Sequence, residues 1–516
     1  MNVEEFLEAA KAAIEDAAEY HETVTTKRVI SDVQPGYLSS LMPASAPVDP
    51  EPFSAIRADF HDNIMPGMTH WHSPRFMAFF SCHSSYPAII GDIYANAMSG
   101  AYFNWICSPA ATELEVIVLD WLAQELNLPE CFKSKGSTRG GGVLHGSASE
   151  AVLIAMAAAR DKYVAARTKH MPDGVDKEDE VWRVRSKMVV LASTGTHSST
   201  QKAANILGLR FEAIRAYEED TFSLQGRHLA TKLEQLEARG LEPFFLTLTM
   251  GTTDVCAVDD FEGIADVLKQ RLTRGRYPDI WVHVDAAMAG SALILPEHKH
   301  NTKAFHNFSS FNFNPHKWLL TGYDCSATFV RSREDLINTL SIKPAYLRNR
   351  PSADDTTEYR DWQIALGRRF RSLKLWFVLR SYGISGLQAH VRSGISMAES
   401  LEQKLRTRPD LFAIFTPASF ALVTLRVVGR DMDEMNARTQ RVFNRVTDGG
   451  EYYLTNTVVE CKFVIRVTFG VTSVREEHVE GVFGVLVREA EKECREQIDT
   501  PSYDDIAKIP AREGRL

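Results

Sequence analysis

The sequence predicts an α/β fold with a large domain on a mostly parallel central sheet and a smaller α+β domain after it. Apolar segments such as KMVVLAS (187–193) and PFFLTLTMG (243–251) alternate with amphipathic helical segments, which is typical of buried parallel strands joined by helices. The last third instead has a long helical stretch (363–407) before FALVTLRVV (420–428) and KFVIRVTFG (462–470). A chain of 516 residues is also too long for one ordinary hydrophobic core.

The N-terminal part is expected to form an arm and not a core of its own. Proline recurs through residues 33–74, which disfavours regular elements and predicts an extended segment that wraps a surface. A helix is predicted before it, over residues 3–20. Its apolar side chains fall on one face: Val3, Phe6, Leu7, Ala10, Ile14 and Ala17.

The other elements follow in order along the chain. A glycine-rich turn at 136–151 enters a helix, and residues 341–361 lack apolar periodicity and predict a mobile loop. A charged helix to about residue 498 precedes a loose tail. Further helices are predicted at 86–100 and 110–127, and further strands at 279–287, 309–314 and 325–331.

Composition and charge exclude several classes of function. The formal net charge of -9 disfavours a nucleic-acid binder, which needs cationic contacts with phosphates. No apolar run approaches the roughly 20 residues that cross a bilayer, and the acidic N-terminus lacks the apolar core of a signal peptide. Seven scattered cysteines without a CxxC pair predict reduced thiols and a cytoplasmic location. No HExxH spacing accompanies the histidines, so no metal is expected.

One lysine stands in an apolar, aromatic setting. Lys317 lies in FNFNPHKWLL (311–320), and a lysine ammonium is costly to bury unless it is paired or loses its proton. A buried lysine with a lowered pKa is a nucleophile that often forms Schiff bases. Pyridoxal 5'-phosphate (PLP) is the common partner, and it also needs an acid for its ring nitrogen and a cradle for its phosphate.

Each of these further groups has a candidate. Asp285 ends the apolar strand IWVHVD, where parallel sheets bind ligands, although it could be an ordinary cap or turn residue. Gly146–Ser149 opens a helix whose N–H groups favour an anion, or it is a plain serine cap. His197, in a loop after a strand, could stack on a ring or be an ordinary loop histidine.

Read in order, these motifs resemble a known family. GSASEA, His197, HVDAAMAG and NFNPHKWLL, with MPGMTHWHSPRFMAFF, GTTDVCAVD and YRDWQIALGRRFRSLKLWFVLR, are similar to the group II PLP-dependent decarboxylases, most of all the aromatic L-amino-acid decarboxylases. The resemblance runs from about residue 1 to 485. It implies PLP-dependent fold type I and a homodimer with active sites at the interface. The implied parts are an arm wrapping the partner (1–85), a large PLP domain (86–362), a small domain (363–485) and a terminal helix end and tail (486–516).

The resemblance also implies roles for single residues. Lys317 would bind PLP, Asp285 would pair with its ring nitrogen and His197 would stack on the ring. Tyr346, on the 341–361 loop, would return a proton to Cα. Relatives that make aldehydes oxidatively replace the tyrosine or the histidine, and this chain keeps both, so decarboxylation to an amine is favoured. The implied phosphate contacts are Ser147, Ala148, Ser149, Asn314 and His316, and Thr253 and Ala287 would line the cofactor.

The implied substrate is an aromatic L-amino acid. Gly367 matches a position where glycine leaves room for an indole, so tryptophan and 5-hydroxytryptophan are favoured, with phenylalanine, tyrosine and DOPA possible. A non-catalytic protein of the same fold and a glutamate decarboxylase are weaker alternatives. The chain departs from the family around the pocket at Ser81–Cys82–His83, Ala101–Tyr102, Met288 and Thr321–Tyr323. The expected aromatic wall is Trp71, Phe79, Phe80 and Phe103.

Overall fold

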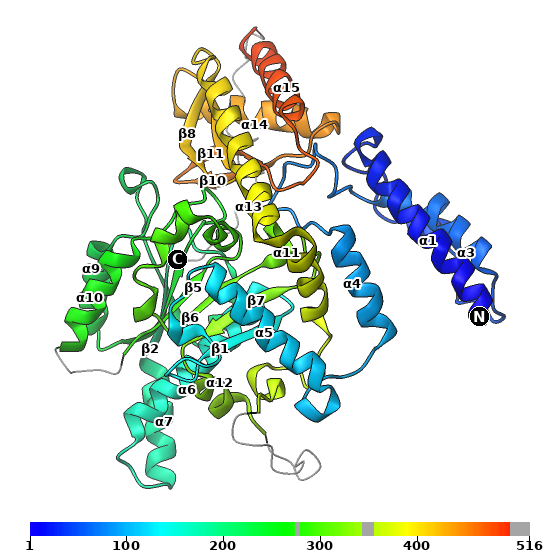
Figure 1. Cartoon of the computed structure of the whole chain (residues 1–516). Helices are drawn as coiled ribbons and strands as arrows, with labels where there is room; N and C mark the ends of the chain where they lie inside the picture. The colour runs from blue at the N-terminus through cyan, green and yellow to red at the C-terminus, as the bar shows by residue number, and fades with distance from the viewer. Residues whose placement is uncertain (274–278, 343–355, 496–516) are drawn as a thin grey trace.

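A seven-stranded sheet forms the centre of the molecule. The computed structural model describes residues 1–273, 279–342 and 356–495 (Figure 1). The strand order is β1-β7-β6-β5-β4-β2-β3, and β7 is antiparallel to both its neighbours while β6, β5, β4, β2 and β3 run parallel. The predicted mostly parallel sheet is therefore confirmed. Its strands are Gly141–His145, Met188–Ser193, Arg210–Ile214, Glu242–Thr249, Trp281–Asp285, Ser310–Phe313 and Ser326–Val330, for β1 to β7.

The two faces of this sheet differ because successive side chains of a strand point to opposite sides. Val282 and Val284 of β5, with Phe311 and Phe313 of β6, belong to the core that extends to the smaller domain. Trp281 belongs to a second core, built around helix α6 on the other face. The helices of this part of the chain are α4 Tyr86–Ala97, α5 Pro109–Glu125, α6 Ala148–Thr168, α7 Val175–Lys187, α8 Ser199–Ile206, α9 Gly226–Ala238, α10 Phe261–Thr273, α11 Pro315–Trp318 and α12 Arg333–Leu340.

The C-terminal part is a four-stranded antiparallel sheet with helices, in the order β10-β11-β9-β8. Helix α13 (Arg371–Arg406) packs on α4, α5 and β8, so it joins the two parts of the chain (Figure 1). The helix starts at Arg371 and not at the predicted residue 363. The remaining elements are β8 Phe412–Ser419, β9 Leu422–Val427, α14 Met432–Gly449, β10 Thr455–Val459, β11 Lys462–Thr468 and α15 Glu476–Arg495.

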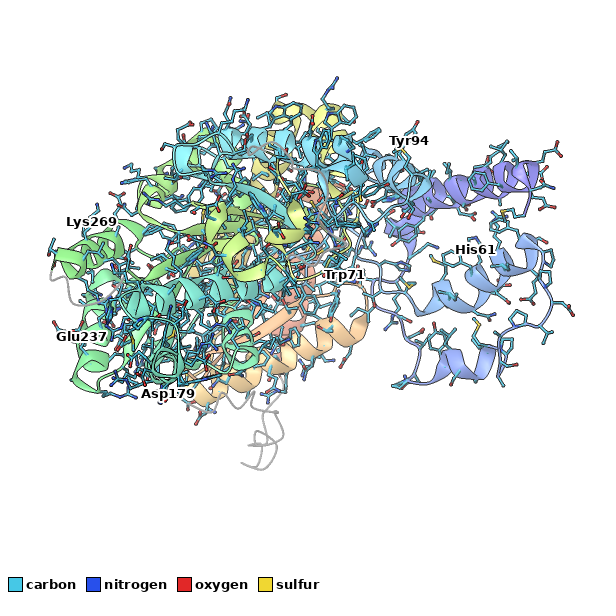
Figure 2. All side chains as sticks on the ribbon, turned by 90° about the horizontal axis from the view of Figure 1, so that it is seen from below. His61, Trp71, Tyr94, Asp179, Glu237 and Lys269 are labelled. Atoms are coloured by element: carbon cyan, nitrogen blue, oxygen red, sulfur yellow. The ribbon has the colours of Figure 1, made fainter. Side chains whose placement is uncertain are left out.

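The N-terminal arm projects from the body of the molecule (Figures 1 and 2). Helix α1 spans Val3–Thr23, close to the predicted 3–20, and α2 (Tyr37–Leu41) and α3 (Phe53–Asp59) follow. The apolar face predicted for the first helix is not buried within the described chain. Its large members Val3, Phe6, Leu7 and Ile14 are all exposed.

Two segments predicted as a turn and a loop contain ordered structure. The glycine-rich segment 136–151 is not only a turn, because it contains strand β1, whose five residues are all buried. Of the predicted loop 341–361, residues 343–355 lie outside the described residues. Its end is packed, since Tyr359 and Trp362 are buried in a short 3₁₀ turn.

Candidate active site

A cavity of about 200 Å³ lies where β4, β5 and β6 end and helix α6 begins. This is the crevice at which open α/β sheets bind ligands. The structure brings all ten predicted cofactor residues to this one place, together with Phe80 of the predicted substrate wall. The predicted residues that line it are Phe80, Ser147, Ala148, Ser149, His197, Thr253, Asp285, Ala287, Asn314, His316 and Lys317.

Asp285 is the last residue of β5 and is buried. Its Oδ1 accepts a hydrogen bond from the Ala287 N–H at 3.0 Å, which holds the carboxylate in place after the strand. Across the sheet it stands in register with Thr249 of β4 and Asn312 of β6. The carboxylate therefore has a fixed position at the floor of the cavity.

Lys317 reaches the same cavity from α11, the short helix after β6. Its Nζ lies 5.7 Å from the ring centroid of Phe80. Burial lowers the pKa of the amine, and the carboxylate of Asp285 opposes this shift. Lowering the pKa increases the unprotonated fraction, which is the nucleophilic form. The lysine is therefore placed as a Schiff-base nucleophile requires.

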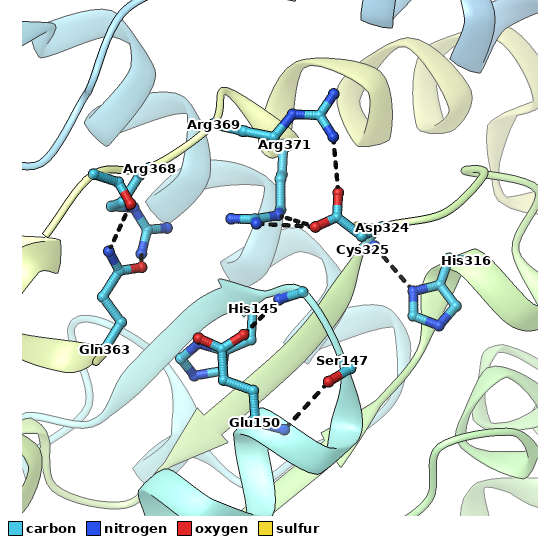
Figure 3. Close-up of polar contacts among 12 residues, drawn as sticks. His145, Ser147, Glu150, His316, Asp324, Cys325, Gln363, Arg368, Arg369 and Arg371 are labelled. Atoms are coloured by element: carbon cyan, nitrogen blue, oxygen red, sulfur yellow. Dashed lines mark hydrogen bonds and ion pairs between the residues drawn. The ribbon is translucent and has the colours of Figure 1, made fainter. Parts of the chain in front are cut away.

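The start of α6, where the phosphate cradle is predicted, lies at the edge of this cavity (Figure 3). The Ser147 side chain caps the helix by accepting from the Glu150 N–H at 3.3 Å. Gly146 leaves the room that this turn needs, because a Cβ there would lie 3.3 Å from Oδ2 of Asp324 and 3.4 Å from Oε2 of Glu150. The Asp324 carboxylate is itself paired with Arg371 at 2.9 Å. Its charge is thus balanced beside a site suited to an anion.

His316 and Asn314 complete this side of the cavity. Nδ1 of His316 accepts a hydrogen bond from the Cys325 N–H at 2.9 Å, and burial lowers the pKa of the ring to about 3. The ring is therefore neutral, with its proton on Nε2 as a donor. The buried Asn314 leaves Oδ1 without a partner among the described residues. A hydrogen-bond donor bound in the cavity would satisfy Oδ1, and with the amide turned over its NH₂ group would donate to an anion. These residues therefore fit PLP.

His197 follows β2 and precedes α8. Its Nδ1 accepts from the Ser199 N–H at 3.1 Å and lies 2.9 Å from the Ser199 hydroxyl. Ser199 thus fixes the imidazole plane at the wall of the cavity. This contact favours the functional interpretation of His197 over an unconstrained loop histidine.

The structure does not bring four of the five predicted substrate residues to this cavity within the described chain. Trp71 stacks on Phe79 with centroids 5.8 Å apart, and both rings are more than a third exposed. Phe103 and Gly367 lie near each other, because segment 101–103 hydrogen-bonds to Arg360 and Arg368. None of these side chains lines the cavity that Lys317 lines. Tyr346 lies outside the described residues.

Sequence reasoning did not assign several residues of the cavity wall. Cys82, Met288 and Tyr323 line it, although they were noticed only as departures from the family pattern. The Tyr323 ring lies 4.7 Å from that of His316. Thr249 and Gly251 also line the wall. Thr249 could have been predicted, because the alternation of side chains along β4 places it on the same face of the sheet as its register partner Asp285.

Comparison with known proteins agrees with this geometry. Residues 35–428 match the pyridoxal-dependent decarboxylase conserved domain. The chain belongs to this family of PLP-dependent enzymes, and its cofactor is PLP. The resemblance inferred from the motifs is thereby confirmed.

Individual relatives cover nearly the whole chain. Tryptophan decarboxylase 2 of Oryza sativa subsp. japonica is 40% identical over 95% of this chain and 96% of its own length. A phenylacetaldehyde synthase of Arabidopsis thaliana is 39% identical, over 95% and 96%. The crystal structure of Oryza sativa TDC with PLP and tryptamine superposes with a TM-score of 0.88 at 36% identity, covering 95% of this chain and 99% of that one. The predicted fold type I is confirmed.

Proposed function

We propose that this enzyme removes the carboxylate of aromatic L-amino acids and releases CO₂ and the aryl amine. The observation that carries the proposal is that Lys317 and Asp285 share one cavity with the start of α6, in a chain 40% identical to a tryptophan decarboxylase. The experiment is to incubate the PLP-loaded protein with a panel of L-amino acids and identify the products by mass. Amines from aromatic substrates support the proposal, and amines from glutamate alone contradict it.

Each residue of the cavity has a task in this reaction. When bound, PLP accepts the electron pair that remains after the bond from Cα to the carboxylate breaks. Lys317 would hold the cofactor until a substrate amine replaces it. Asp285 would keep the ring nitrogen protonated, since a carboxylate close to a cation favours the charged form. His197 would cover one face of the ring. Ser147, Ala148, Ser149, Asn314 and His316 would hold the phosphate, with Thr253 and Ala287 beside the ring.

The proton that completes the amine must be delivered at Cα, and we propose Tyr346 as its donor. A tyrosine that closes over the site with its loop would also exclude water from the reacting atoms. Because relatives of both product classes match this chain nearly equally, the alternative is an oxidative synthase of aromatic aldehydes. Hydrogen peroxide and aldehyde in place of amine would favour that alternative.

We propose that the working unit is a homodimer. Phe103 and Gly367 do not face the cavity of their own chain, and they would complete the aromatic wall of the partner's cavity. The arm, residues 1–85, would wrap the partner and bury the exposed apolar side chains of α1. Exposed Ile90, Ile93 and Tyr94 on α4 would belong to the same interface. Sedimentation analysis of the purified protein tests the dimer directly.

The expected substrate is an amino acid with an indole or phenol ring. Phe80 lines the cavity and offers aromatic surface for such a ring. Trp71, Phe79 and Phe103 would extend this surface in the dimer, where Gly367 would leave space for the larger indole. We therefore favour tryptophan and 5-hydroxytryptophan over phenylalanine, tyrosine and DOPA.

We also propose that the enzyme works in the cytoplasm. All seven cysteines are free thiols, as is usual in a reducing compartment. Among the described residues, no helix is long and apolar enough to span a bilayer. Fractionation of cells that express the full chain would test the location.

A further inference from the structure

A row of polar side chains lies between β5 and β6, on the face of the sheet that α6 covers. In the parallel pairing of these strands, His283 stands opposite Ser310 and Asp285 opposite Asn312. All four side chains are buried, with His283, Ser310 and Asn312 fully excluded from solvent. On the opposite face the same two strands carry Val and Phe. The polar row is thus a local feature of the strands that lead to Asp285.

Hydrogen bonds of good length connect three members of this row, Ser310, His283 and Asn312, with Trp281. The Trp281 Nε1 lies 2.7 Å from the Ser310 Oγ, and the Ser310 Oγ lies 2.7 Å from Nδ1 of His283. Nε2 of His283 lies 2.7 Å from Oδ1 of Asn312. The indole nitrogen can only donate and the amide oxygen can only accept. Nε2 of His283 therefore donates to Asn312 Oδ1, and in the neutral ring Nδ1 accepts from the Ser310 hydroxyl.

The environment also sets the charge of the imidazole. Burial lowers the pKa of His283, while the carboxylate of Asp285 and the hydrogen bond to Asn312 oppose the shift. The ring of Phe245 lies stacked on the imidazole with centroids 6.1 Å apart. Among the described residues, Asp285 is the charged group whose proximity raises the pKa of His283. Buried polar networks are costly unless their members are satisfied, and Asn312 Nδ2 has no hydrogen-bond partner among the described residues. A network of this kind beside Asp285 calls for a functional reason.

We propose that His283 is a positioning residue that acts through Asp285, held by Ser310 and Asn312 as a neutral imidazole protonated on Nε2. A cationic imidazole at this place would compete with the cofactor nitrogen for the negative charge of Asp285. A neutral imidazole leaves the whole charge of the carboxylate to the ring nitrogen of PLP. The inference rests on the proposed role of Asp285 and adds that a neutral His283 keeps the negative charge of Asp285 available for the cofactor.

The first test reads the imidazole itself and needs no cofactor. The protein is labelled with ¹⁵N-histidine, and the His283 signals are assigned by their loss in His283→Gln. We expect the shifts of a neutral ring with its proton on Nε2 throughout the pH range in which the protein is folded. A cationic ring at neutral pH, or a proton on Nδ1, would overturn the proposal.

The second test places a charge beside the imidazole. Asn312→Asp offers Nε2 a carboxylate, which favours the imidazolium. In the holoenzyme we expect weaker PLP binding, an altered pH dependence of the cofactor absorbance, and a kcat lower by roughly 10-fold or more with little change in KM, the scale known for outer partners of catalytic groups. Ser310→Ala is the milder second variant and should give a mixture of the two neutral tautomers in the NMR spectrum.

Two comparisons make the result decisive. Thr328 stands in register with Asn312 on the other side of β6 and is buried, but its hydroxyl has no hydrogen-bond partner among the described residues. Thr328→Val is therefore the matched control and should leave the His283 spectrum and PLP affinity unchanged. Asp285→Asn tests the proposed role of Asp285 separately from that of His283. If Asp285→Asn impairs the enzyme while Asn312→Asp leaves PLP affinity and absorbance within about twofold of wild type, the inference on His283 is wrong and the role of Asp285 stands.

Discussion

Lys317 and Asp285 line the same cavity, and the Asp285 carboxylate opposes the fall in pKa that burial imposes on the Lys317 amine. Lys317 lies on α11, the helix after β6, and Asp285 is the last residue of β5. The two residues come close together because β5 and β6 are neighbours in the sheet. In the proposed reaction the carboxylate would act on two groups in turn, the Lys317 amine before the cofactor is bound and the ring nitrogen of PLP afterwards. We therefore expect Asp285 to be the most sensitive position of the cavity.

Asp285→Asn should lower kcat by roughly 100-fold or more, because losing the charge removes several kcal/mol of electrostatic stabilisation in a buried site. The measurement is the initial rate of tryptamine formation at saturating PLP, with cofactor content determined for each preparation. Asp266→Asn, at an exposed position of α10, is the control. Wild-type rates in Asp285→Asn would remove the carboxylate from the reaction.

Tyr346→Phe should redirect the products from amine toward aldehyde, since the proton donor for Cα is lost while bond cleavage continues. Amine, aldehyde and hydrogen peroxide are quantified from the same reaction with tryptophan. Tyr382→Phe on α13, far along the chain from the loop, should keep the wild-type product ratio. An unchanged ratio in Tyr346→Phe would assign the proton to another group.

Gly367→Ser should reduce kcat/KM for tryptophan by roughly 10-fold while affecting tyrosine less, the size expected when one small group enters a shaped pocket. Among the described residues, a Cβ at this position would meet only Ala101, at 4.0 Å, so we expect the serine to fit its own chain and the loss to reflect the substrate. Gly449→Ser, where a Cβ meets nothing within 4 Å, is the control. Equal losses for both substrates would reduce Gly367 to a packing position.

A histidine cluster at the base of the arm should make the protein sensitive to acid. His72 lies 4.6 Å from His21 and 5.2 Å from the buried His83, by ring centroids. Burial lowers the pKa of His72 and of His390 to about 4, and that of His83 well below its usual value. Folding thus favours the neutral rings, so this part of the stability is complete above about pH 6.5 and is lost as the pH falls toward 4.

His83→Gln removes one of these groups. Below pH 6.5 it should reduce the slope of the free energy of unfolding against pH by up to about 1.4 kcal/mol per pH unit. Unfolding by urea is measured at pH 7 and pH 5 for the wild type, for His83→Gln and for His170→Gln, whose side chain is exposed. Only His83→Gln should narrow the difference between the two pH values. The same pH dependence in all three proteins would show that the cluster does not control acid stability.

The sequence predicted the strands that are rich in apolar side chains. The bounds of β2, β4 and β5 were predicted to within two residues because central parallel strands are buried on both faces. β1 was missed because its first residues are glycines inside a glycine-rich segment, and β3 because this edge strand is only partly buried. Edge strands lack the apolar pattern, so only pairing with a neighbour reveals them.

The site was predicted as far as it follows the ends of elements and the family motifs. Lys317, Asp285 and the start of α6 each directly follow or open an element, and the structure places them together. The network around His283 could not be predicted, because it depends on the register of β5 against β6. The sequence also could not predict that Phe103 and Gly367 do not line the cavity of their own chain. A family motif does not show which side chains face the cavity of the same subunit.

The most direct test of the account is to locate the covalent attachment of the cofactor. The holoprotein is treated with borohydride and digested, and the peptide that carries reduced PLP is identified by mass spectrometry. We predict one modified peptide, with PLP on Lys317, and none from Lys317→Ala. PLP on another lysine, or a protein that binds no PLP when the cofactor is in excess, would contradict the account.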